Sequence, residues 1–184
     1  PQDIVKELAL AKAENVARIL SERALTKAAK CHAPTMVTGG QSAVEAVFVP
    51  DSRVIIGADT VVVRDGKILG KPRDEAEAVV MLQGLQGRPH EVYTGVVLLE
   101  CDDGGMHVRA SHAEGTKVFV RGMDEEEIRG YVSTGEAMDK AGAYGIQGRF
   151  AVYIDRIEGD YYNVVGLPVS YLYRQLKSLG FLAG

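Results

Sequence analysis

Apolar residues recur at helical spacing at both ends of the chain and twice between them. The first such stretch predicts a helix over residues 3–25. Asp74, followed by acids in the first turn, predicts the start of a second helix. Asp124 and Glu127 have the spacing of a capping box and predict the start of a third. Pro168 and Gly180 suit the two ends of a last helix that runs to about Leu179.

Short apolar runs rich in β-branched residues lie between these helices and predict strands. Asp65-Gly66 between two such runs is a strong hairpin signal. The glycine-rich stretch 138–149 is expected outside regular structure, and DDGG at 102–105 is expected to be a turn. The expected strands are VIIGADTVVV (54–63), ILGKP (68–72), EVYTGVVLLE (91–100), a segment over about 106–121, and FAVYIDRIEG (150–159).

Strands and helices therefore alternate, which predicts an α/β domain with a mixed central sheet and flanking helices. The 184 residues are enough for one domain with a real core, or for one domain with a small lobe. The pattern dissolves over residues 28–52, which hold Pro, paired Gly, Ser and Thr. We expect a surface loop or an inserted hairpin there, of variable sequence and without function.

Composition limits the function classes. The net charge of −4 argues against a broad nucleic-acid-binding surface, so an anionic ligand would be held by a few local Lys and Arg side chains. Cys31 and Cys101 have no metal-binding spacing and favour free thiols in a reducing compartment, so a cytoplasmic location is expected. No apolar run reaches about 18 residues, so we expect no membrane span. The amphipathic start of the chain is not typical of a signal peptide.

Asp59 is the most informative single residue. It interrupts the apolar strand 54–63, where an unpaired ionised carboxylate would be costly to bury. Small Gly57 and Ala58 precede it and would let a ligand approach the backbone. Asp59 could bind a divalent cation or take a proton from water. Equally, it could be a structural carboxylate that accepts from backbone N–H groups.

Three further stretches could carry chemistry. Lys71 in GKP (70–72) could reach a phosphate as a point charge, although an exposed lysine after a turn is common. The loop DKAGAYGIQG (139–148) could present backbone N–H groups to an anion, with Lys140, Tyr144 and Gln147 adding charge, an aromatic face and an amide; a flexible linker is the alternative. Asn163 favours a structural role in a turn. The four histidines lack zinc-site spacing, and no P-loop, Rossmann or serine-hydrolase motif is present.

Five motifs in one order resemble the Maf family of nucleoside triphosphate pyrophosphatases. The helix segment ALAKAENVA is similar to the family's A-x-x-K-A helix. The resemblance covers nearly the whole chain except residues 28–52, and the motifs are IIGADTVV, DGKILGKP, GRPHEVYTGV, STGEAMDKAGAYGIQG and IEGDYYNVVGLP.

The resemblance implies a single two-lobed α/β domain over 1–184 around a cleft, similar to the inosine triphosphate pyrophosphatases. It implies hydrolysis of a nucleoside triphosphate to the monophosphate and pyrophosphate with Mg²⁺ or Mn²⁺. The strand and the Ser-x-Ser-Pro-Arg-Arg loop with which family members open have no counterpart in these residues. A homodimer is expected from the habit of the family alone.

Site residues are carried over position by position. The family's catalytic and metal-binding acid falls on Asp59. Lysines that face the phosphates fall on Lys12 and Lys71, and positions tied to base choice fall on Thr60 and Gln147. Lys140 is the remaining candidate for substrate binding.

The motifs Ala-Asp-Thr and Tyr-Gly-Ile-Gln resemble the dTTP/UTP branch of the family, which implies a house-cleaning role on canonical or modified pyrimidine triphosphates. Two alternatives stay open at this point. The first is a nucleotide-binding regulator of septum formation and cell division that does not turn its ligand over. The second is a purine-type house-cleaning pyrophosphatase.

Overall fold

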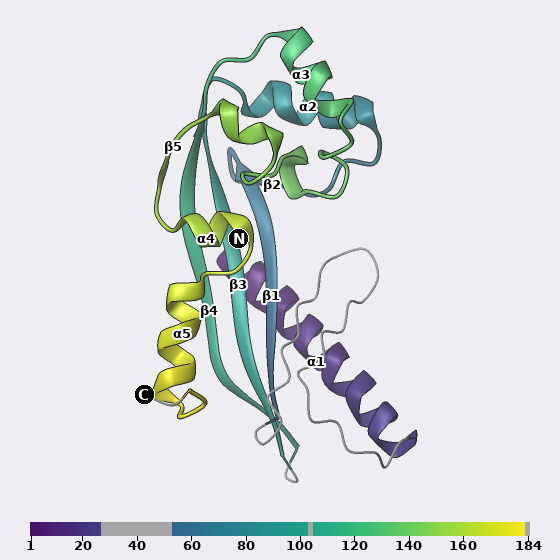
Figure 1. The fold of residues 1–184 in the computed structure, drawn as a ribbon, viewed down its shortest axis with the longest axis vertical. Coiled ribbons are helices and arrows are strands. Elements are labelled where there is room, and N and C mark those ends of the chain that lie inside the picture. The colour runs from purple at the N-terminus through teal and green to yellow at the C-terminus, as the bar shows by residue number, and fades with distance from the viewer. Residues whose placement is uncertain (27–52, 103–104, 183–184) are drawn as a thin grey trace. The chain divides into compact units, whose positions relative to one another are not determined.

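The computed structural model describes residues 1–26, 53–102 and 105–182 (Figure 1). The predicted loop at 28–52 and the centre of the DDGG turn lie outside these residues. The described helices and strands are α1 (Gln2–Thr26), β1 (Arg53–Arg64), β2 (Lys67–Leu69), α2 (Glu75–Leu85), β3 (Pro89–Asp102), β4 (Gly105–Val120), α3 (Glu125–Val132), η1 (Ala141–Ala143), η2 (Arg149–Tyr153), β5 (Ile154–Glu158), α4 (Tyr161–Val165) and α5 (Val169–Ser178).

The five strands form one sheet in the order β2-β1-β3-β4-β5. The pairs β1–β2 and β4–β5 are antiparallel. Helices alternate with these strands along the chain and flank the sheet, so the prediction of an α/β fold with flanking helices is confirmed. None of the helices in the described part of the chain is both long and apolar enough to cross a membrane.

The chain folds as two compact units. Unit 1 comprises Thr60–Thr94 and Glu114–Pro168 together with Pro1, and unit 2 comprises Gln2–Asp59, Gly95–Ala113 and Val169–Gly184. Strands β1, β3 and β4 each contribute residues to both units. Each unit has a core of its own, and the two are described separately.

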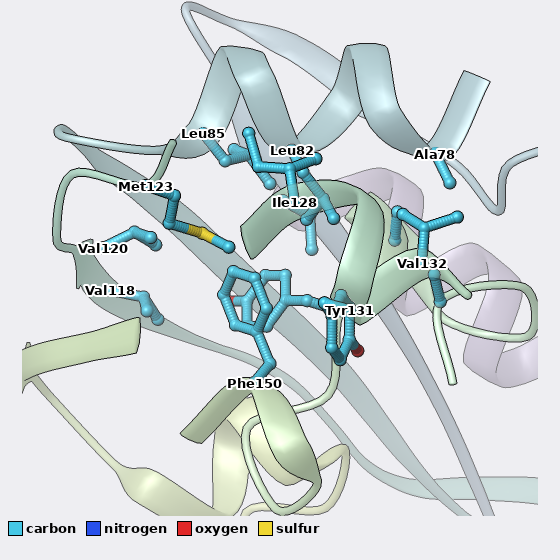
Figure 2. Packing of buried hydrophobic residues seen from close by; sticks show 14 of the residues in the cluster. Ala78, Leu82, Leu85, Val118, Val120, Met123, Ile128, Tyr131, Val132 and Phe150 are labelled. Atoms are coloured by element: carbon cyan, nitrogen blue, oxygen red, sulfur yellow. The ribbon is translucent and has the colours of Figure 1, made fainter. Parts of the chain in front are cut away.

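Unit 1 is built around a cluster of aliphatic and aromatic side chains from its strands, α2, α3 and the 3₁₀ segments. Figure 2 shows Phe150 beside Tyr131, with Met123 and Ile128 close by. The Phe150 and Tyr131 ring centroids lie 5.0 Å apart, and Phe150 is fully buried. The smaller core of unit 2 is formed by Ala13, Val16, Ala17, Ile55 and Leu99.

Local sequence signals explain most element boundaries. Asp65 and Gly66 both have positive φ, 50° and 75°, as a two-residue type I′ hairpin requires. Asp74 accepts a hydrogen bond from the Glu77 N–H at 2.8 Å. Asp124 and Glu127 form the complete capping box that their spacing predicts.

The C-terminal helix ends as its glycine predicts. Gly180 has φ +78°, and its N–H donates to the Lys177 carbonyl at 3.1 Å. The Phe181 N–H donates to the Leu176 carbonyl at 2.9 Å, which completes a Schellman motif.

One predicted strand is wrong in its first half. Residues 149–153 form the 3₁₀ helix η2, and β5 begins only at Ile154. The reason is tertiary, because Phe150 packs against the rings of Tyr131, Tyr144 and Tyr153, with centroids 4.7–5.3 Å away. The five-residue helix α4 was not predicted, since one turn is too short to show periodicity.

Candidate functional site

Asp59 and Lys12 form an ion pair in unit 2. The Lys12 ammonium donates to the Asp59 carboxylate, and it also lies 3.4 Å from the Ala58 carbonyl oxygen. The two side chains are only 19% and 18% exposed, so each charge depends on the other for compensation. The acid that interrupts the apolar strand is therefore paired, and no backbone N–H of the described residues donates to it. Its partner is the lysine that the family resemblance had singled out.

The close approach of α1 to the strands brings these two residues together. A Cβ atom on Gly57 would lie 2.1 Å from the Ala9 carbonyl oxygen and 2.9 Å from the Ala13 Cβ. A Cβ atom on Gly95 would lie 2.1 Å from the Val5 carbonyl oxygen. The glycines thus let the helix lie directly on β1 and β3, which explains the small residue two positions before Asp59.

In unit 1, the GKP segment contacts the glycine-rich loop 139–148. The Gly142 N–H donates to the Gly70 carbonyl at 3.0 Å, so Lys71 follows a residue that is bonded to the loop. Lys140 contacts Asp139 at 2.5 Å, and this hydrogen bond, with Lys71 as a weaker influence, lowers the pKa of the Asp139 carboxyl. The structure therefore brings Lys71, Asp139 and Lys140 into one charged neighbourhood.

The loop is held in an unusual backbone conformation. Gly142 and Ala143 have φ of +69° and +64°, and a Cβ on Gly142 would meet the Val62 side chain at 2.9 Å. The Tyr144 hydroxyl lies 2.7 Å from Nε2 of buried His90. These contacts and the burial of Ala143 and Tyr144 contradict the flexible-linker alternative.

Gln147 is exposed at the end of this loop, and Glu136 holds the residues that follow it. The Glu136 carboxylate accepts from the Arg149 N–H at 2.8 Å. A Cβ on Gly148 would lie 2.2 Å from the same carboxylate, so a side chain at this position would displace the Glu136 carboxylate. The sequence did not indicate this role of Glu136, because its partner Arg149 is thirteen residues away.

Thr60, which is partly exposed, belongs to a hydrogen-bonded chain of hydroxyl and amide groups in unit 1, whose other members are buried. Its hydroxyl lies 2.8 Å from that of Thr94, which donates to the Asn163 backbone carbonyl at 2.7 Å. Thr94 and Asn163 are fully buried. The expectation that Asn163 is structural agrees with this burial, whereas Thr94 was missed because a single threonine in an apolar strand gives no signal.

Burial perturbs three groups near the loop. It lowers the pKa of His90 to about 4, so the imidazole is neutral at physiological pH. It raises the pKa of the Tyr131 hydroxyl to about 12 and raises the pKa of Tyr144 as well. None of these groups is therefore charged near pH 7.

The acidic side chains of the described residues can be tested as ligands of a divalent cation. Among these residues, no three His, Cys, Asp or Glu side chains gather into a metal-binding group. Mg²⁺, however, is often held by one or two carboxylates together with substrate phosphates and water. Asp59 fits the role of such a single carboxylate ligand. Its partner Lys12 also lies near the Ala58 carbonyl oxygen, which is a second oxygen beside the carboxylate.

The site residues predicted from the sequence belong to both units. Lys12 and Asp59 lie together in unit 2. Lys71 and Lys140 lie near Asp139 in unit 1. Thr60 and Gln147 also belong to unit 1, Thr60 in its hydroxyl chain and Gln147 at the loop end.

The family model for Maf-like protein matches residues 1–179. The chain belongs to this family. The match spans residues of both units, and all the candidate residues lie within the matched range.

Curated relatives of this Maf-like chain include three proteins named dTTP/UTP pyrophosphatase. The protein of Carboxydothermus hydrogenoformans is 55% identical over 70% of this chain and 67% of its own length. That of Agathobacter rectalis is 44% identical over 98% of this chain and 80% of its own length. That of Geobacillus sp. is 55% identical over 69% of this chain and 66% of its own length.

Proposed function

We propose that this Maf-like chain is a nucleoside triphosphate pyrophosphatase that hydrolyses dTTP and UTP to the monophosphate and pyrophosphate. The observation that carries the proposal is the Lys12–Asp59 pair, which joins an acid in the apolar interior of β1 to a cation on α1, with both side chains mostly buried. The names of the curated relatives support the substrate class. Modified pyrimidine triphosphates belong to the same class, which corresponds to a house-cleaning role.

In the proposed reaction, water attacks the α-phosphorus, the bond from that phosphorus to the bridging oxygen breaks, and pyrophosphate leaves. Asp59 orients the water and accepts its proton. Lys12 and Lys71 compensate the charge that develops on the leaving pyrophosphate, and Lys140 contributes to phosphate binding. A divalent cation, Mg²⁺ or Mn²⁺, would neutralise phosphate charge when bound at Asp59.

Base choice falls to the polar groups of unit 1. The edge of uracil or thymine offers an acceptor, a donor and a second acceptor. The exposed Gln147 amide can match two of these, because it both donates and accepts. Thr60 is the second proposed contact to the base.

The experiment measures pyrophosphate release from a panel of nucleoside triphosphates, with Mg²⁺ or Mn²⁺ present. Steady turnover of dTTP and UTP is expected. Tight binding without product would instead support a nucleotide-binding regulator of cell division, and faster turnover of purine triphosphates would support a purine-type enzyme. Either result would overturn the proposal.

Asp59→Asn tests the role of the acid. The amide still accepts a hydrogen bond from Lys12 but no longer compensates its charge, so the variant should be less stable and is assayed where circular dichroism shows it folded. Turnover by the folded variant should fall at least 100-fold because the base is lost. Asp3→Asn is the matched control, since it removes an exposed Lys–Asp pair (2.8 Å) from the same helix. Normal turnover by Asp59→Asn would refute the mechanism.

A further inference from the structure

We infer that Thr94 is a positioning residue that turns the hydroxyl proton of Thr60 inward, so that Thr60 can only accept a hydrogen bond from a substrate. This inference rests on the proposed function and deepens it. It assigns Thr60 the one donor on the edge of uracil or thymine, N3–H. It also gives the buried Thr94 a role in base selection.

Thr60, Thr94 and the Asn163 backbone carbonyl form a hydrogen-bonded series, and the carbonyl determines the direction of both hydrogen bonds. The Asn163 backbone carbonyl oxygen has no hydrogen, so the Thr94 hydroxyl must donate to it across their 2.7 Å separation. A hydroxyl carries one hydrogen, and that of Thr94 is now used. Across the 2.8 Å between the two hydroxyls, Thr60 must therefore donate and Thr94 must accept.

Asn163, at the inner end of this hydrogen-bonded series, is held in place by several hydrogen bonds. Both hydrogens of the Asn163 side-chain amide are engaged, one with the Val92 carbonyl at 3.0 Å and one with the Thr116 hydroxyl at 2.9 Å. The Asn163 backbone carbonyl also accepts from the Gly166 N–H at 3.1 Å. With Asn163 and Thr94 fully buried, neither group can turn to water for another partner.

Thr60 is the solvent-accessible end of this hydrogen-bonded series. It is partly exposed, whereas Thr94, Thr116 and Asn163 are buried. With its proton committed inward, its hydroxyl oxygen keeps lone pairs for a ligand and has no hydrogen to offer. A ligand atom that needs a donor would face these lone pairs at a cost, because the contact would be repulsive.

Pyrimidine bases differ at N3, which is the position that Thr60 would contact. Uracil and thymine carry a hydrogen on N3, and cytosine carries a lone pair there instead. An acceptor-only Thr60 therefore favours UTP and dTTP over CTP. The Gln147 amide is then left to donate to a neighbouring carbonyl oxygen of the base.

The experiment compares kcat/KM for UTP and CTP in the wild type and in Thr94→Val, Thr94→Ser and Thr116→Val. In Thr94→Val the Thr60 proton loses its acceptor and can turn toward the ligand. We expect the UTP/CTP ratio to fall at least tenfold, mainly through a lower KM for CTP. Thr94→Ser keeps the hydroxyl and should retain the wild-type ratio. If Thr94→Val does not fold, Thr94→Ser still tests the inference, because a changed ratio in a variant that keeps the hydroxyl would overturn it.

Thr116→Val is the control for a structural effect. It removes an acceptor of the Asn163 amide but leaves the Thr60–Thr94 pair in place. It should lower the thermal midpoint without changing the UTP/CTP ratio. Equal loss of the ratio in Thr116→Val and Thr94→Val would overturn the inference.

The two levels of the proposal fail in different ways. If the wild type releases pyrophosphate from no pyrimidine triphosphate, the proposed function is wrong. If it hydrolyses UTP but shows no preference over CTP, or if Thr94→Val keeps the full preference, only the inference on Thr94 is wrong.

Discussion

Lowering the pH is expected to destabilise unit 1 through His90. His90 is 3% exposed, and its Nε2 lies 2.7 Å from the Tyr144 hydroxyl. Its Nδ1 is buried and has no hydrogen-bond partner among the described residues. Burial lowers the pKa of this imidazole to about 4. The fold therefore accommodates the neutral ring and excludes the charged one.

The size of the effect follows from the two pKa values. His90 titrates near pH 6.5 in the unfolded chain and near pH 4 in the folded protein. Above pH 6.5 both states are neutral, and the stability is fully present. Between pH 6.5 and pH 4 only the unfolded state binds the proton, so stability falls as the pH falls. At about 1.4 kcal/mol for each pH unit, the total loss is about 3 kcal/mol.

The assay is urea unfolding from pH 7.5 to pH 4, followed by circular dichroism, for the wild type and His90→Gln. Between these two pH values, the free energy of unfolding of the wild type should fall by about 3 kcal/mol more than that of the variant. Parallel curves for wild type and His90→Gln would refute the argument, because carboxylates elsewhere would then account for all the pH dependence.

Three further predictions concern the site and the packing beneath it. Gly57→Ala should lower the free energy of unfolding by about 1–3 kcal/mol in a denaturation experiment, because the new Cβ would meet the Ala9 carbonyl at 2.1 Å; Gly130→Ala, with nothing within 4 Å, should be close to neutral, and equal costs would contradict this explanation. Gln147→Glu should reduce kcat/KM for dTTP and UTP at least tenfold by replacing a donor with an acceptor, and unchanged rates would exclude the amide from base recognition. Chelation by EDTA should abolish pyrophosphate release, and Mg²⁺ or Mn²⁺ should restore it; full activity in EDTA would remove the cation from the proposal.

Short-range rules account for most of what the sequence alone determined. The hairpin at Asp65-Gly66, the caps at Asp74 and Asp124, and the stop at Gly180 each depend on contacts within six residues. The family pattern likewise identified Lys12 and Asp59. The homodimer and the cytoplasmic location stay predictions.

Long-range contacts decided the rest. Nothing near residue 59 indicates that Lys12, forty-seven positions earlier, neutralises its acid. The 3₁₀ turn at 149–153 replaces a strand because Phe150 enters an aromatic cluster that only the folded chain assembles. The proton direction at Thr60 depends on Asn163, more than a hundred residues away. A local pattern fixes backbone conformation, whereas charge compensation, packing and hydrogen-bond polarity depend on which distant groups the fold brings into contact.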